Sequence, residues 1–181
     1  VLFMFKILFG RSVWALRLSA SLFGIGSVAL VLGLRRYLSP FTVYSAALFM
    51  AVSAGMNFYS PYAIHESELL FFSLLALLGF FRFEAKRDRT SLWQLSLGLT
   101  GMALNKETWI IHVGTFAIAY YALRFYESFV PSSDPKPHRV ANKFTPDDLF
   151  WCVTINIFIL ILFFTGFFLN PQGLTDFFAA Y

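Results

Sequence analysis

Long apolar runs separated by short polar turns make up most of this chain. A helix needs roughly 20 apolar residues to cross a bilayer, and six runs approach that length. The predicted helices span residues 12–34, 40–58, 61–81, 92–105, 107–125 and 146–169. The pattern therefore predicts an all-α fold: a polytopic transmembrane bundle of about six spans, with residues 1–181 in a single transmembrane domain.

Several of these helices begin at a recognisable start signal. A hydroxyl residue followed by proline is typical of an N-cap and the first helical position. Acidic residues in the next turn are favoured by the helix dipole, and serine with glutamine three residues later indicates a capping box. These signals occur at Ser39-Pro40, at Ser60-Pro61, at Thr145-Pro146 with Asp147 and Asp148 following, and at Ser91 with Gln94.

Composition indicates an integral membrane protein. The chain is 58% hydrophobic and only 13% charged, whereas a soluble domain is about 25% charged. The net charge of +4 does not indicate nucleic-acid binding, because the basic residues cluster in short turns between apolar runs. We therefore expect membrane lipids, and no nucleic acid, as partners. Cys152 lies in an apolar run and is interpreted as an inert core thiol, and Trp109 as an interface anchor near a span end.

The basic residues also predict the topology, because positively charged loops stay in the cytoplasm. One set of alternate turns holds ten of the 14 basic residues: Arg35, Arg36, Arg82, Lys86, Arg87, Arg89, Arg124, Lys136, Arg139 and Lys143. That side is predicted to be cytoplasmic, including a proline-rich linker loop at residues 127–147. The opposite, extracytoplasmic side then holds both polar breaks described next, in a bacterial inner membrane.

Two charged breaks interrupt the apolar pattern, and charge in a lipid-compatible sequence usually marks a functional site. The first contains His65 and Glu66, the first carboxylate of the chain, and the second contains Lys106 and Glu107. The topology predicts that both breaks open on the same side. We interpret Glu66 as a substrate-binding or orienting residue.

Simpler interpretations compete at each position. The presence of Glu68 is explained by its position in a first helical turn, where an acid interacts favourably with the helix dipole. His65 and Glu68 share a helix face but are too few to hold a metal, so no metal or other cofactor is predicted. Lys106 and Arg17 are candidates to bind phosphate, and each could instead extend its charged end to the membrane surface.

Four segments, taken in order, resemble polytopic glycosyltransferases of the C-type fold, the protein O-mannosyltransferase-like enzymes of family 39. The matching segments are Arg17-Leu18-Ser19-Ala20-Ser21-Leu22-Phe23-Gly24, Tyr59-Ser60-Pro61-Tyr62-Ala63-Ile64-His65-Glu66, Asn105-Lys106-Glu107-Thr108 and Phe167-Phe168-Leu169-Asn170-Pro171-Gln172-Gly173-Leu174. The resemblance implies transfer of a sugar from a polyprenyl-phosphate carrier to an acceptor at the extracytoplasmic face. It also implies that His65, Glu66, Lys106, Glu107 and Arg17 bind the substrate.

The sequence departs from this family in two ways. The family places its catalytic acid before the helix that begins near Ser12, but no Asp or Glu precedes Glu66. The general base is therefore expected upstream of residue 1, in which case this stretch is a fragment or a truncated product and inactive alone. Pro61 also stands where relatives often carry Arg. The alternative function is a non-catalytic membrane subunit or a flippase-associated protein that binds lipid-linked glycans.

Overall fold

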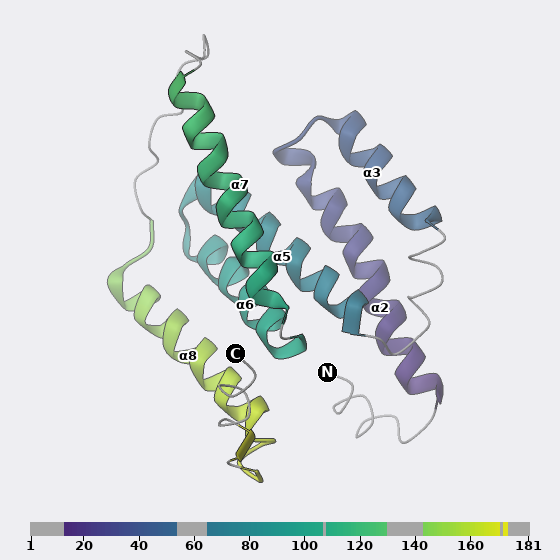
Figure 1. The fold of residues 1–181 in the computed structure, drawn as a ribbon, viewed down its shortest axis with the longest axis vertical. Helices are drawn as coiled ribbons and strands as arrows, with labels where there is room; N and C mark the ends of the chain where they lie inside the picture. The colour runs from purple at the N-terminus through teal and green to yellow at the C-terminus, as the bar shows by residue number, and fades with distance from the viewer. Residues whose placement is uncertain (1–12, 54–64, 107, 130–142, 171, 174–181) are drawn as a thin grey trace.

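The computed structural model describes residues 13–53, 65–106, 108–129, 143–170 and 172–173, and these form an all-helical arrangement without strands. The elements, shown in Figure 1, are α2 (Val13–Gly33), the short 3-10 helix η1 (Leu34–Arg36), α3 (Pro40–Val52), α5 (His65–Lys86), α6 (Arg89–Asn105), α7 (Trp109–Phe129) and α8 (Pro146–Phe164). The predicted all-α fold class is confirmed for this part of the chain.

Two of the predicted helix starts are confirmed. The Ser39 side chain accepts a hydrogen bond from the Thr42 backbone N–H, with Pro40 at the first helical position. Thr145 and Asp148 form a reciprocal capping box at the start of α8. The predicted start at Ser60-Pro61 lies outside the described residues.

The predicted capping box at Ser91 is wrong. The N-cap of α6 is Asp88, whose Oδ1 accepts a hydrogen bond from the Ser91 N–H at 2.8 Å. Ser91 is buried in the first turn, and its hydroxyl donates to the Asp88 carbonyl at 2.7 Å. An aspartate in the preceding loop therefore caps the helix three residues earlier than the sequence pattern suggested.

Helix lengths also differ from prediction. Within the described residues α3 ends at Val52 rather than at Phe58, so its 13 residues span about 20 Å. By contrast, α5 and α7 continue four or five residues beyond their predicted ends, to Lys86 and Phe129. Most of the predicted linker at 127–147 lies outside the described residues and stays a prediction.

Consecutive helices run in alternating directions through the bundle. Helices α2 and α5 are parallel, since Phe23 contacts Phe71 and Tyr37 stacks on Phe81 further along both helices. Helices α6 and α8 are also parallel. Arg89 pairs with Asp148 at their beginnings and Thr100 bonds Asn156 in their middles. One end of the bundle therefore collects the starts of α2, α5 and α7, as Figure 1 shows.

The closest helix packing is between α5 and α6. A Cβ added to Gly98 would lie 2.5 Å from the Ala76 backbone nitrogen, and one added to Gly79 would lie 2.5 Å from the Leu95 nitrogen. Small residues let two helix backbones approach without a side chain between them, which is a common arrangement in membranes. This antiparallel pair forms the centre of the fold, and Met102 of α6 is fully buried within it.

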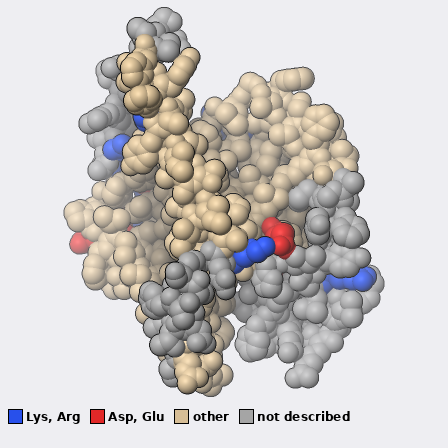
Figure 2. Space-filling view, viewed as in Figure 1, with Lys and Arg blue, Asp and Glu red and all other residues tan. Residues whose placement is uncertain are grey.

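The outer helices expose much apolar surface. Helix α7 has no buried residue, and α3 exposes Phe41 and Phe49 almost completely. Figure 2 shows few charged side chains among the coloured atoms of one face. Among the described residues, one helix, α8, is both long and apolar enough to cross a membrane. The predicted six-span topology goes beyond this finding.

Candidate functional site

The two charged breaks meet at one end of the bundle. The Lys106 Nζ donates to the Glu66 Oε1 at 2.7 Å, although 40 residues separate them along the chain. Their side chains remain 39% and 49% exposed, respectively. This contact places both breaks at one end of the bundle, while the membrane side that they face stays a prediction.

The fold explains why these two side chains meet. Glu66 lies in the first turn of α5, and Lys106 follows the last residue of α6. Since these two helices pack antiparallel along their lengths, the start of one lies beside the end of the other. Lys106 has extended backbone geometry, and its N–H still donates to the Met102 carbonyl. The turn thereby directs a cation out of the apolar bundle toward a carboxylate.

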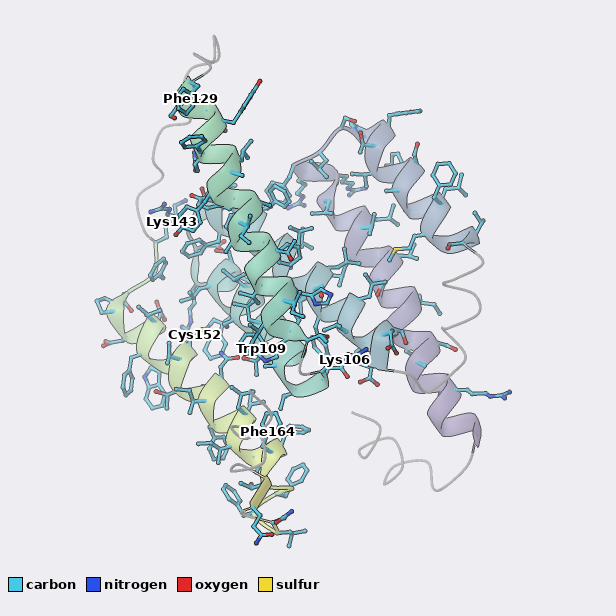
Figure 3. All side chains as sticks on the ribbon, viewed as in Figure 1. Lys106, Trp109, Phe129, Lys143, Cys152 and Phe164 are labelled. Atoms are coloured by element: carbon cyan, nitrogen blue, oxygen red, sulfur yellow. The ribbon has the colours of Figure 1, made fainter. Side chains whose placement is uncertain are left out.

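A tryptophan lies beside this ion pair at the start of α7. The backbone N–H of Trp109 donates to the Lys106 carbonyl at 3.1 Å. Figure 3 labels both residues at the turn. The indole packs against the core cluster of Leu69, Ala76 and Met102. Its ring Nε1 is buried and makes no hydrogen bond within the described structure. An unsatisfied buried N–H costs on the order of 1–3 kcal/mol, so this unpaired donor is an unusual feature of the turn. The interpretation of Trp109 as an interface anchor misses it.

The other predicted site residues are placed less completely. Arg17 is exposed on α2, near the level of Glu66 because α2 and α5 are parallel, and makes no ion pair with the described acids. His65 opens α5, while its side chain lies outside the described part. Glu107 is also outside it. Glu68 is buried, only 5% exposed, in the first turn of α5.

Sequence reasoning missed a buried polar network between α6 and α8. The Thr100 hydroxyl donates to the Asn156 Oδ1 at 2.6 Å, and the Asn156 Nδ2 donates to the Ser96 hydroxyl at 3.1 Å. The Cys152 thiol donates to the same hydroxyl at 3.0 Å. Cys152 is buried, as its inert interpretation requires, but it hydrogen-bonds rather than only packing. Polar residues at helical spacing on two apolar runs were the available signal.

The segment after α8 adopts an unusual backbone. Gly166, Phe167 and Phe168 have φ values of 56, 61 and 66°, and the left-handed conformation costs roughly 1–2 kcal/mol for a residue with a side chain. The turn is closed by the Asn170 N–H, which donates to the Thr165 carbonyl at 2.9 Å. The Asn170 side chain then accepts from the Gln172 N–H. Phe167, Phe168, Asn170 and Gln172 belong to the last of the four segments singled out in the sequence.

Comparisons with known proteins agree with the sequence resemblance. The family model described as dolichyl-phosphate-mannose-protein mannosyltransferase matches residues 3–170. Protein O-mannosyl-transferase 1 of Rattus norvegicus is 33% identical over 109 residues, and that of Homo sapiens is 35% identical over 109 residues. Each alignment covers 58% of this chain and 15% of the relative. No solved structure matches the chain.

Proposed function

The chain belongs to the dolichyl-phosphate-mannose-protein mannosyltransferase family, and from this premise we propose that it forms the donor-binding part of a membrane glycosyltransferase. The enzyme would transfer a sugar from a polyprenyl-phosphate carrier to an acceptor at the extracytoplasmic face. This chain spans 15% of the length of the curated relatives, so the complete activity is proposed for the intact protein.

The proposed membrane placement is a polytopic bundle of about six spans in the plasma membrane. Helix alternation and the exposed apolar side chains of α3, α7 and α8 support this arrangement. The basic turns would face the cytoplasm. The end with Glu66 and Lys106 would then face outward, where a lipid-linked donor presents its phosphate and sugar.

In the proposed reaction, an acceptor hydroxyl attacks the anomeric carbon of the sugar. A new glycosidic bond forms, the bond from carbon to phosphate oxygen breaks, and polyprenyl phosphate leaves with the bonding electron pair. The hydroxyl proton passes to a general base of the intact protein. The developing charge on the leaving phosphate needs a cation positioned in advance.

Lys106 is the proposed phosphate ligand. Its partial exposure lets a phosphate approach, and the Glu66 carboxylate at 2.7 Å holds the ammonium group in place at this end of the bundle. Arg17, His65 and Glu107 complete the proposed binding set. The contact between Lys106 and Glu66 is the single observation that carries the proposal.

The test is transfer of labelled sugar from polyprenyl phosphate by the intact protein and by Lys106→Ala and Glu66→Gln variants. Removing one charge-stabilising donor from an active site commonly lowers kcat by about 100- to 1,000-fold, and we expect that range for Lys106→Ala. We expect a smaller loss for Glu66→Gln, because the lysine keeps its charge and loses only its orientation.

Glu84→Gln is the matched control. It removes an ion-paired carboxylate from the opposite end of the same helix, where Glu84 lies 3.4 Å from Arg124. Transfer should be nearly unchanged. Normal transfer by both site variants would refute the assigned site. Donor binding without any turnover by the intact protein would favour a non-catalytic lipid-linked glycan-binding subunit instead.

A further inference from the structure

A polar cavity lies at the other end of the bundle, far from Glu66 and Lys106. It encloses about 390 Å³ between η1, the end of α5 and the start of α6. The residues between Glu66 and Arg82 on α5 place the two sites about 24 Å apart. No residue of this cavity belongs to the proposed donor site.

Four cations line this cavity, and the described acids balance little of their charge. They are Arg35, Arg36, Arg82 and Lys86, together with the polar groups of Tyr37 and Gln94. Within the described part of the chain, Arg35, Arg36 and Lys86 make no ion pair with an acid. Asp88 approaches the Arg82 Nη2 at 3.5 Å, and one carboxylate does not balance four cations.

Arg82 adds to this cavity a partly exposed guanidinium whose hydrogen bonds are incomplete. Its Nε is buried, and no described group accepts a hydrogen bond from it. A guanidinium has five N–H donors in a planar fork whose geometry matches a phosphate. The cavity holds roughly a dozen water volumes, so a phosphate group fits with part of its substituent. A partly exposed guanidinium and three cations that pair with no described acid, all lining one cavity, are typical of an anion site.

We propose that this cavity binds the phosphate of an anionic membrane lipid, with Arg36 and Arg82 as its principal ligands. The flanking helices expose apolar side chains, among them Phe41 on α3, and these suit the acyl chains of the same lipid. Basic pockets between membrane helices on the cytoplasmic side are a recognised arrangement for acidic headgroups. The site uses the membrane placement proposed above but none of the sugar-transfer chemistry.

The experiment measures lipid binding to the intact protein in neutral detergent, by native mass spectrometry and without any sugar donor. Phosphatidylglycerol is the anionic probe, phosphatidylcholine the zwitterionic lipid, and inorganic phosphate the free anion. A cation near a membrane surface contributes roughly fivefold in affinity for acidic lipid. The Arg36→Gln/Arg82→Gln double variant should therefore bind phosphatidylglycerol about 25-fold more weakly.

Two further variants guard against misfolding and non-specific charge. Arg35→Gln/Arg36→Gln changes exposed side chains only and should weaken binding by a similar factor. Lys143→Gln removes a cation from the same end, since its backbone N–H donates to the Arg87 carbonyl, but Lys143 does not line the cavity. It should change binding less than twofold.

The proposal is overturned by equal binding of the two lipids, or by unchanged phosphatidylglycerol binding in both double variants. Inorganic phosphate that binds as tightly as the lipid would also reject a lipid headgroup site. Lipid binding is measured without a sugar donor, and sugar transfer is tested with the Lys106 variant. Failure of either proposal can therefore be recognised separately.

Discussion

The two ends of the bundle use charged residues in different ways. At the end with Glu66 and Lys106, a described cation and a described carboxylate form one short, partly exposed ion pair at 2.7 Å. At the opposite end, four cations share a cavity of about 390 Å³ and the nearest described carboxylate lies 3.5 Å from one of them. The first end holds a cation in a defined position, whereas the second accumulates positive charge.

This difference shows how position within a bundle controls the chemistry of one residue type. Lys106 is fixed because an antiparallel helix partner brings an acid to it. Arg35 and Arg36 sit on a short 3-10 turn, exposed, with no such partner among the described residues. The same positive charge can thus serve as an oriented ligand at one end and as an electrostatic attractor at the other.

The largest expected effect comes from separating the helices that join the two ends. Gly98→Val places a side chain where a Cβ already lies 2.5 Å from the Ala76 backbone nitrogen. Backbone atoms cannot move aside cheaply, so we expect a loss of 3 kcal/mol or more, on the order of severe overpacking. Unfolding by denaturing detergent measures it, and both ends should lose their ligand binding together.

Gly114→Ala is the matched control for that prediction. Gly114 lies in the second turn of α7, and a Cβ there would meet nothing within 4 Å. Alanine is better than glycine inside a helix by about 1 kcal/mol, so this variant should be slightly more stable. Similar losses at the two glycines would contradict the close contact between α5 and α6.

At the basic end, Asp88→Ala should cost about 1 kcal/mol, the usual loss for an N-cap. Partial burial works to raise the pKa of Asp88, but hydrogen bonds from Ser91 and the Arg82 charge together lower it. The stabilisation linked to the charge is thus complete above the ordinary pKa of 3.8 and is lost as pH falls through the lower folded-state pKa. Unfolding measured across this pH range tests the sign.

Asp88→Asn separates the cap from the charge. Asparagine caps as well as aspartate, so stability at neutral pH should stay close to the original. The loss of stability in acid that Asp88 contributes should disappear. A variant that kept the same acid dependence would show that another carboxylate is responsible.

Between the two ends, Asn156→Leu tests the buried network of α6 and α8. The variant leaves the Thr100 hydroxyl without the acceptor at 2.6 Å. Hydrogen bonds between membrane helices average about 0.6 kcal/mol in double-mutant cycles, so we expect a loss near 1 kcal/mol in detergent unfolding. The double variant with Thr100→Val should recover part of it, and full additivity would argue against the bond.

The smallest effect on stability is expected for the ion pair itself. Both side chains are substantially exposed, and such pairs contribute about 0.2–1 kcal/mol. A double-mutant cycle of Glu66→Gln and Lys106→Met should give a coupling energy in that range and decreasing with salt. A large stability loss with unchanged sugar transfer would mean that the pair is structural and that the two ends differ less than proposed.

Local signals in the sequence predicted the features that depend on neighbouring residues. Ser39 and Thr145 each carry the cap and the following proline within two residues, and both helix starts are confirmed. The position of Glu66 and Lys106 at one end of the bundle also followed, because alternating helices bring every second turn to one end, but their ion pair was not predicted. The start of α6 was missed because Asp88, inside a charged turn, competes with Ser91 for the same role.

Features that depend on side-chain contacts between helices could not be predicted. The network that joins Thr100 to Asn156 connects residues 56 apart, and no pattern in the sequence states that those two faces pack together. The unsatisfied Nε of Arg82 depends on the fold in the same way. The shortening of α3 at Val52 was also not predicted, because the apolar run continues without a break to Phe58.

The backbone contact of α5 and α6 has a mechanical consequence. Since Gly79 and Gly98 leave no side chain between the helices along their middles, we expect the two helices to move together as one stiff unit. A displacement at one end of the pair should then reach the other end as a tilt of both helices.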